Sequence, residues 1–515
     1  MTLFATVNGR VRGRRTASGV VAVLGIPYAA PPFGPDRFKA PRPARPWRGI
    51  RECVAFGPVA PQSAELPGAL TWSPGDEDVL NLNVWTDGPG GGAGGARPVL
   101  VWIHGGAYTF GSSAQPEFDA TVPARAGLVV VTLNYRLGFE GFGHVPAAGY
   151  PENRGLLDQI AALEWVRDNI AAFGGDPANV TVAGQSAGAA SVACLTVTDR
   201  ARGLFRRAIA HSAVGPAYSP RLAADTTRLV ARAAEVPPTA AGLTGASPYD
   251  LVRASDRVVA RLRDDPAAGP RHYDPVLYGP VVDGVLLPAD PLAADAADRA
   301  DVDLLVCHTT EEYWLLDAVG SSKKITTDRE LAQFAKDFGL PDTLVPAYRA
   351  RLPDAPVLDI YLAVYGDMSF AEYSSRLAER HADAGRRTYL SRFARRRVTE
   401  VGVVHPWHCA DVPFAFGTLA DPETAFLIGG PPLPEDYELS RRMVRAWADF
   451  AATGEPGWGT DTVRIWATDD PDAHDPDAHD PDAHDAHDAH DPDTHDAHDG
   501  FRAAWRAADY ADIHP

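Results

Sequence analysis

The sequence places one serine in a setting that suits nucleophilic catalysis. Gly184-Gln185-Ser186-Ala187-Gly188 has the pattern Gly-x-Ser-x-Gly, in which small flanking residues let the backbone turn sharply and raise the serine hydroxyl into the open. An apolar run at 180–183 precedes the pattern, and we expect a helix after it. Strand, turn and helix form the context in which this pattern indicates a nucleophile, so we predict that Ser186 attacks a substrate.

A second glycine motif could supply backbone amides for a developing negative charge. Trp102-Ile103-His104-Gly105-Gly106-Ala107 follows another strand-like run, and its glycines let the backbone come close to a substrate oxygen. The motif lies about 80 residues before Ser186, and the two motifs in this order indicate acyl transfer more strongly than either alone.

The elements that must position these motifs alternate between strand-like and helical patterns. Apolar residues recur with a helical period from Leu156 to Phe173, and Gly174 and the residues after it stop that helix. We expect a second helix at 439–452 and strands at 80–85, 99–103, 128–134, 303–307 and 389–393. This order predicts an α/β protein with a mostly parallel sheet and helices on both faces.

Two stretches have a composition that suggests connections. The glycine-rich residues 88–95 lead into a strand, so we interpret them as a flexible link and not as a phosphate loop. Residues 220–300 are rich in Ala, Arg and Asp, with prolines between, and we expect helices and loops over the sheet edge there.

The acidic charge of the chain is concentrated near its C-terminus. The formal net charge is −19, but 13 Asp residues lie in 469–499, and without that segment the net charge is −6. Nucleic-acid binding needs clustered Lys and Arg, so we expect no nucleic-acid partner. The segment repeats Pro-Asp-Ala-His-Asp units and holds too little apolar surface to fold, so we predict a disordered insertion.

This repeat divides the chain. We predict a catalytic domain at 1–468, the disordered repeat at 469–499, and a C-terminal segment at 500–515. Phe501, Trp505 and Tyr510 restore aromatic content after the repeat, so the last segment is expected to pack back on the domain.

Location and cofactors can be judged from what the sequence lacks. We see no secretory signal at the N-terminus and no apolar run long enough for a bilayer, so we expect no membrane partner. The four cysteines are scattered, without the spacing of a metal site or a disulfide framework. A cytoplasmic protein with reduced thiols and with no metal or other cofactor is the expectation.

Further motifs make a family resemblance plain. Beyond the two glycine motifs, they lie at residues 25–29, 37–38, 77–84, 134–138, 155–159 and 173–177. With these motifs, the chain resembles the type-B carboxylesterase family, which includes para-nitrobenzyl esterases and cholinesterases, over nearly everything outside the repeat. The resemblance implies an α/β-hydrolase fold and hydrolysis of ester substrates.

The resemblance also implies roles for individual residues. The family's acid follows a short strand in a pattern like Gly-Thr-Asn-x-Asp-Glu-Gly, which puts Glu312 in that position; Cys307 and Tyr313 replace glycines of the pattern. The family's histidine begins a pattern like His-Gly-x-Asp, which His408 matches, whereas His405 does not. The remaining roles are an oxyanion hole and supporting contacts, assigned to the N–H groups of Gly106, Ala107 and Ala187 and to the side chains of Gln185 and Ser212.

Several alternatives stay open at this stage. The triad does not distinguish esters from carbamates or amides, and some relatives have lost the serine and serve in adhesion or binding. Trp72 lies near a loop where cholinesterases place a choline-stacking tryptophan. If Glu312 is not the acid, the candidates are Glu311, Asp283 and Asp411.

Overall fold

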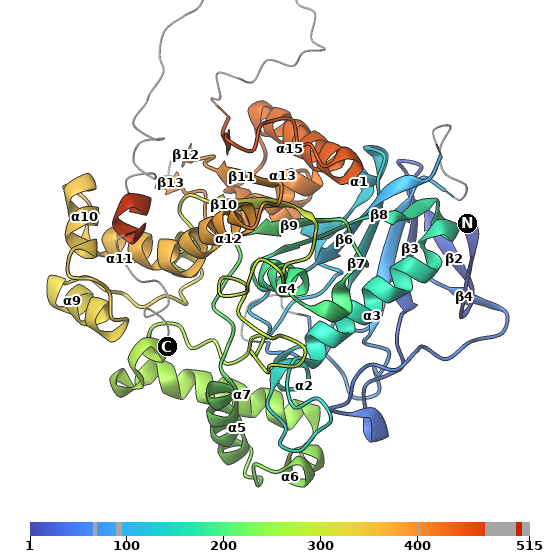
Figure 1. Cartoon of the computed structure of the whole chain (residues 1–515), viewed down its shortest axis with the longest axis horizontal. Coiled ribbons are helices and arrows are strands. Elements are labelled where there is room, and N and C mark those ends of the chain that lie inside the picture. Colours follow the sequence, from blue (N-terminus) through green and yellow to red (C-terminus); the bar gives the residue numbers. More distant parts are fainter. Residues whose placement is uncertain (65–69, 89–94, 400–401, 469–500, 507–515) are drawn as a thin grey trace, which may run out of the picture.

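The computed structural model describes residues 1–64, 70–88, 95–399, 402–468 and 501–506. Within these residues, twelve strands form one sheet, which is antiparallel at its N-terminal side and parallel over the remainder (Figure 1). The expectation of a mostly parallel sheet is confirmed. In spatial order the strands are β1 (Thr2–Thr6), β2 (Gly9–Arg15), β3 (Val21–Pro27), β5 (Asn81–Thr86), β7 (Val129–Leu133), β6 (Arg97–Ile103), β8 (Gly175–Gln185), β9 (Arg207–His211), β10 (Asp303–Thr309), β11 (Thr388–Phe393) and β14 (Val463–Trp466), with β4 (Ile50–Glu52) beside β2.

Helices cover both faces of this sheet. Alternate residues of β6 enter two separate cores, with Val101 on one face and Trp102 on the other. The face of Val101 is covered by α3 (Arg154–Asn169), α4 (Ala187–Thr196) and α12 (Glu372–Asp383). The face of Trp102 is covered by α1 (Thr121–Arg125), α13 (Val412–Phe416) and α15 (Pro434–Thr453).

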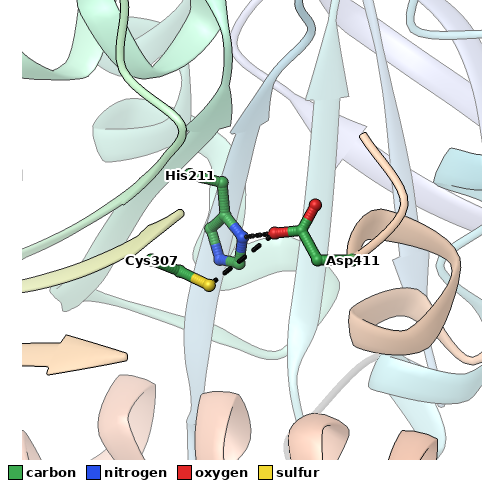
Figure 2. Close-up of side chains that lie close together, drawn as sticks. All are labelled: His211, Cys307 and Asp411. Atoms are coloured by element: carbon green, nitrogen blue, oxygen red, sulfur yellow. Dashed lines mark hydrogen bonds and ion pairs between the residues drawn. The ribbon is translucent and has the colours of Figure 1, made fainter. Parts of the chain in front are cut away.

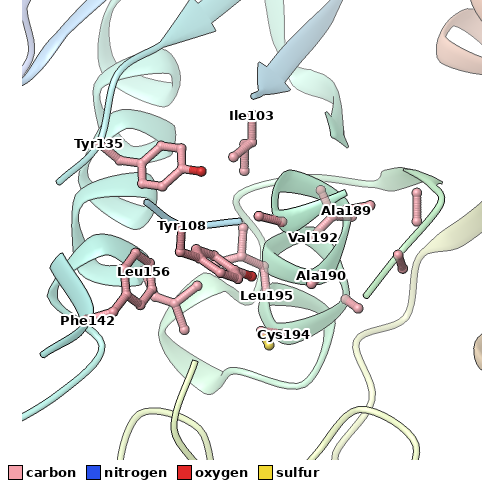
Figure 3. Packing of buried hydrophobic residues seen from close by; sticks show 14 of the residues in the cluster. Ile103, Tyr108, Tyr135, Phe142, Leu156, Ala189, Ala190, Val192, Cys194 and Leu195 are labelled. Carbon is pink, nitrogen blue, oxygen red and sulfur yellow. The ribbon is translucent and has the colours of Figure 1, made fainter. Parts of the chain in front are cut away.

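The helix that follows Ser186 lies fully within the first core. All ten residues of α4 are buried, and Figure 3 shows Val192 and Leu195 beside Tyr108 and Ile103. Its small residues permit a close approach, because a Cβ atom at Gly188 would lie 2.0 Å from the carbonyl oxygen of Ile103. The start of α4 is therefore held firmly against the end of β6.

Most expected elements occur with shifted ends. The helix expected at 156–173 is α3, followed by a 3-10 turn at Ile170–Phe173 and by Gly174 at φ 83°. The late helix begins earlier than expected, at Pro434 in α15, and residues 89–94 of the expected glycine-rich link lie outside the described residues.

Residues 220–300 begin with a group of helices. These are α5 (Pro220–Ala233), α6 (Ala240–Gly245) and α7 (Pro248–Asp264), followed by a 3-10 segment at Pro266–His272. Helix α7 packs on α5 and on α2 (Gly138–Phe142), so the group joins the body through α2 (Figure 1).

A helical turn at residues 501–506 docks on the far side of the molecule from β1. Phe501 stacks on Tyr348 of α10 (Leu344–Arg351) with 4.3 Å between ring centroids. The indole N–H of buried Trp505 donates to the Tyr348 hydroxyl at 2.8 Å, and that hydroxyl donates to Asp367. Burial raises the pKa of Asp367 to about 7 against the opposing hydrogen bond from Tyr348. The predicted repeat at 469–499 lies outside the described residues.

Asp367 opens a stretch of π-helix that leads toward the functional residues. This stretch, Asp367–Ala371, joins α11 (Val357–Gly366) to α12. It carries Phe370, whose ring lies 4.2 Å from the ring of His408, centroid to centroid. The docked turn and His408 therefore both contact residues of one helical segment.

Candidate active site

Four neighbouring parallel strands bring the candidate residues to one edge of the sheet. β6, β8, β9 and β10 are consecutive in the sheet, so their carboxyl ends lie side by side. The residues that follow these strands are the glycine motif at 104–107, Ser186, Ser212 and Glu312. Open α/β sheets bind ligands at such an edge.

Ser186 occupies a strained turn between β8 and α4. Its backbone lies at φ 56° and ψ −123°, a conformation that L residues rarely adopt. The turn is tight because a Cβ atom at Gly184 would lie 2.5 Å from the backbone of Gly188. The backbone N–H of Ser186 donates to the carbonyl oxygen of His211 in β9 at 2.8 Å, which fixes the turn to the sheet.

The glycine motif after β6 lies directly against this turn. A Cβ atom at Gly105 would be 3.1 Å from the Cβ atom of Ser186, and one at Gly106 would be 2.0 Å from the carbonyl oxygen of Phe110. Gly106 and Ala107 both have positive φ, at 109° and 50°. Ala187 is the first residue of α4, where backbone N–H groups have no partner within the helix. The three amides predicted for the oxyanion hole thus belong to segments that meet at Ser186.

Glu312 and His408 form a buried hydrogen-bonded pair. Oε2 of Glu312 lies 2.6 Å from Nδ1 of His408, and the backbone N–H of His408 donates to the carbonyl oxygen of Glu312 at 3.0 Å. The other carboxylate oxygen, Oε1, accepts from the Ser212 hydroxyl at 2.6 Å and from the Thr309 N–H at 2.7 Å. With the Nδ1 proton directed at the carboxylate, Nε2 of His408 keeps a lone pair for another proton.

The neighbouring residue Glu311 turns to different partners. Its carboxylate lies 3.1 Å from Nδ1 of His405 and accepts from Nε of Arg396 at 3.0 Å. Burial raises the pKa of Glu311, but the hydrogen bond from His405 and the charges of Arg396 and His405 outweigh it and leave the pKa below its usual value. Two adjacent glutamates thus contact two different histidines, and only Glu312 contacts His408.

The two remaining acid candidates are engaged elsewhere. Oδ1 of Asp283 accepts three consecutive backbone N–H groups, from Val285 at 2.9 Å, from Leu286 at 2.8 Å and from Leu287 at 3.0 Å. Oδ2 of Asp411 lies 2.5 Å from Nδ1 of His211. Trp72, the residue considered for choline esters, stacks on Phe33 at 5.7 Å and donates to the carbonyl oxygen of Asp76.

The pair of His211 and Asp411 is part of a buried cluster that we did not expect from the sequence. Figure 2 shows both side chains with Cys307, whose Sγ lies 3.7 Å from the Asp411 carboxylate. Burial alone would raise the pKa of Asp411. The charge of His211 and its hydrogen bond to Asp411 outweigh burial and hold the pKa below its usual value, so the aspartate is ionised. Burial raises the pKa of the Cys307 thiol well above its usual value, which keeps the thiol protonated.

These three residue types also bind metals, but their geometry here is that of a hydrogen-bonded cluster. Two ligand atoms on one tetrahedral zinc ion are about 3.3 Å apart, because each bond is about 2.0 Å long. The Nδ1 atom of His211 and Oδ2 of Asp411 are only 2.5 Å apart. The ring of Trp447 crosses His211 edge to face at 4.6 Å and fills the space beside it.

Two further contacts of His408 were not specified from the sequence, although Gln185 was given a supporting role. Its Nε2 lies 2.9 Å from the side-chain Nε2 of Gln185, and its ring packs on Phe370. Gln185 directly precedes Ser186, so this contact brings the histidine to the turn of Ser186.

A buried strand that includes a histidine, as at 207–211, was a signal in the sequence for a partner such as Asp411.

The fold and the site together define a hydrolase of the α/β type, with a strained serine, a Glu–His pair and a glycine-rich loop at the carboxyl edge of a mostly parallel sheet. The chain belongs to the carboxylesterase family, whose family model matches residues 2–474. It is a type-B carboxylesterase, and serine-dependent ester hydrolysis is the general activity of that family.

Known relatives agree with this assignment. The chain is 33% identical to the para-nitrobenzyl esterase of Bacillus subtilis (strain 168) over 470 residues, which cover 88% of this chain and 90% of the relative. It is 33% identical to the phenmedipham hydrolase of Pseudarthrobacter oxydans over 465 residues, with the same coverage of 88% and 90%. The crystal structure of a Geobacillus stearothermophilus carboxylesterase at pH 6.2 superposes with a TM-score of 0.77 at 34% identity, covering 91% of this chain and 96% of that one.

Proposed function

We propose that the chain hydrolyses small carboxylic esters through a covalent intermediate on Ser186. In this proposal His408 is the general base and acid, and Glu312 orients its ring. The N–H groups of Gly106, Ala107 and Ala187 bind the oxyanion. The observation that carries the proposal is the 2.6 Å hydrogen bond between Nδ1 of His408 and the Glu312 carboxylate, beside the strained turn of Ser186.

The proposed reaction has two halves. His408 takes the hydroxyl proton of Ser186 through Nε2 while the serine oxygen attacks the ester carbonyl. The negative charge on the carbonyl oxygen is stabilised by the backbone amides, and Glu312 stabilises the imidazolium. His408 then gives its proton to the leaving alcohol, and a water molecule repeats the cycle on the acyl-enzyme to release the acid.

Ser212 supports this arrangement by holding the acid in place. Its hydroxyl donates to Oε1 of Glu312, while Oε2 faces His408. The carboxylate therefore has one oxygen fixed by Ser212 and Thr309 and one free for the imidazole. This division of the two oxygens supports the role of Ser212 predicted from the family resemblance.

A panel of p-nitrophenyl esters of increasing acyl length tests the function. We expect turnover that varies with acyl length, and loss of turnover in Ser186→Ala with an unchanged thermal unfolding midpoint. Trapping the acyl group on Ser186 by rapid acid quench and mass spectrometry would identify the intermediate. Wild-type rates in the folded Ser186→Ala variant would refute the assigned nucleophile.

A second candidate activity is hydrolysis of phenmedipham. It is favoured by the relative named phenmedipham hydrolase, which matches this chain over 88% of its length. The triad acts on an acyl carbon whichever atom leaves, so carbamates and amides are also within reach of the same residues. Release of product from phenmedipham by the wild type, and not by Ser186→Ala, is the expected result if the same site serves this substrate.

We also propose a cytoplasmic location. The four cysteines are all unpaired, and three of them are buried, which supports a reducing compartment. In the described residues, no helix is long and apolar enough to cross a membrane. Fractionation of the native host with an antibody to the chain tests the location, and recovery outside the cytoplasm would refute it.

A further inference from the structure

The side chain of Gln185 is fixed between the base and the oxyanion loop. Its Nε2 lies 2.9 Å from Nε2 of His408, and a Cβ atom at Gly105 would lie 2.7 Å from its Oε1. The side chain also forms a hydrogen bond with the thiol of Cys409, the residue after His408. Cys409 has a positive φ of 72°, so the backbone is held in a rare conformation at this contact.

These contacts define what Gln185 can do chemically. Nδ1 of His408 is committed to Glu312, so Nε2 of the neutral ring has a lone pair and no proton. The Gln185 amide has N–H groups to donate to that lone pair. A neutral imidazole is therefore a good partner for Gln185, and an imidazolium, which has no lone pair, is a poor one.

We propose that Gln185 is a positioning residue that holds the neutral ring of His408 ready at Nε2 and gives up this nitrogen to the Ser186 hydroxyl when an ester binds. The proposal rests on the proposed function, because it takes His408 as the base. A glutamate at this position would act in the opposite way, since its ionised carboxylate accepts hydrogen bonds and favours the protonated ring.

The other groups that face His408 explain why a neutral neighbour matters. The Glu312 carboxylate contacts Nδ1, and Asp411 is near enough for its charge to interact with the ring. Phe370 covers one ring face, and the thiol of Cys409 is kept protonated because burial raises its pKa well above the usual value. Two carboxylates thus already favour the charged ring, and Gln185 is the polar side chain here that favours the neutral one.

The test is the pH dependence of kcat/KM for a p-nitrophenyl ester. Gln185→Met keeps the length of the side chain but cannot donate, and Gln185→Glu adds a negative charge. A hydrogen bond between neutral groups corresponds to about a three- to tenfold change in an equilibrium, so Gln185→Met should move the acidic limb up by about 0.5 to 1 pH unit. An adjacent charge has a larger effect, so Gln185→Glu should move the limb up by about 1 to 3 units.

Gln333 provides the matched control. It is an exposed residue of α9 (Asp328–Asp337), and its amide donates to Asp337. Gln333→Glu makes the same change at an exposed position whose side chain contacts Asp337, so its acidic limb should coincide with that of the wild type.

The outcomes separate this inference from the proposed function. An acidic limb that moves to higher pH in the order Gln, Met, Glu at position 185 supports the role of Gln185. Loss of a purely structural residue would lower the maximal kcat/KM and leave the pH of the limb unchanged. If the limbs of the wild type and the variants coincide, or if the limb of Gln185→Glu moves to lower pH, the inference about Gln185 is overturned. An inactive Ser186→Ala variant would then show that the proposed function still holds. If Gln185→Glu fails to fold, Gln185→Met decides alone. Activity in folded Ser186→Ala would overturn the proposed function and this inference together.

Discussion

Asp367 provides a sharp test of how burial acts in this protein. The carboxyl accepts a hydrogen bond from Tyr348, which in turn accepts one from the Trp505 indole. Burial, and then the charges of Glu372 and Glu312, raise the pKa of Asp367 to about 7, against the hydrogen bond from Tyr348. An unfolded chain would ionise this group near pH 3.9, so the folded state is penalised as the pH rises above that value.

The size of the penalty follows from the difference between the two pKa values. At about 1.36 kcal/mol per pKa unit, the penalty is about 1.5 kcal/mol near pH 5 and about 4 kcal/mol near pH 8. Relaxation of the site reduces both figures. Asp367→Asn keeps an acceptor for Tyr348 and cannot ionise, so we expect stabilisation that grows by about 1 to 2.5 kcal/mol from pH 5 to pH 8.

Urea unfolding at both pH values measures this effect. Asp337 is the control, because it also accepts from a tyrosine, Tyr273 at 2.8 Å, but it is only partly buried. Asp337→Asn should change stability by a similar amount at both pH values. An Asp367→Asn variant with the same change at pH 5 and pH 8, or with more stabilisation at pH 5, would refute the reasoning.

Three further predictions concern the site. Glu312→Gln should reduce kcat by up to about 10⁴-fold with correct folding, whereas Glu311→Gln should have a small effect. Steady-state kinetics of both variants measure this, and a larger loss of kcat in Glu311→Gln would contradict the prediction. His408→Ala should abolish turnover of p-nitrophenyl esters and His405→Ala should not, so an inactive His405→Ala variant with normal folding would argue against the assigned base. Asp411→Ala should cost about 1 to 3 kcal/mol in urea unfolding near neutral pH, because it leaves the buried Nδ1–H group of His211 without an acceptor. Since the pKa of Asp411 is lowered by folding, its stabilisation is lost as pH falls below about 4, and a cost of Asp411→Ala that grows there would refute this role of the carboxylate.

The features predicted best from the sequence were strands and turns that depend on neighbouring residues. Strand period and glycine positions located the sheet and the turn of Ser186, because both depend on neighbouring residues. The end of β10 was placed at Cys307 and lies at Thr309, yet Glu312 still meets His408. Glu312 was assigned by aligning the family pattern with the residues from Cys307 to Tyr313. That alignment does not depend on where the strand ends, so the shift did not change the assigned residue.

Contacts between distant segments could not be predicted in the same way. Gln185 and His408 are 223 residues apart, and no local pattern reports a hydrogen bond across that separation. The helices within 220–300 did carry a local signal that we did not use. Ser247 and Asp250 form a capping box at the start of α7, and its serine, proline and acidic residue at fixed spacing mark a helix start.

The division of the proposed triad between strands has a consequence for how activity arises. Ser186 follows β8, which pairs with β9, and Glu312 follows β10, the next strand of the sheet. The chain between β9 and β10 includes an exposed turn, where Val285 is 83% exposed. A chain divided at that turn would leave the proposed nucleophile on one fragment and the proposed acid and base on the other. Hydrolysis by such a pair of fragments would then report whether β9 and β10 have joined, so this enzyme could serve as a split reporter of association.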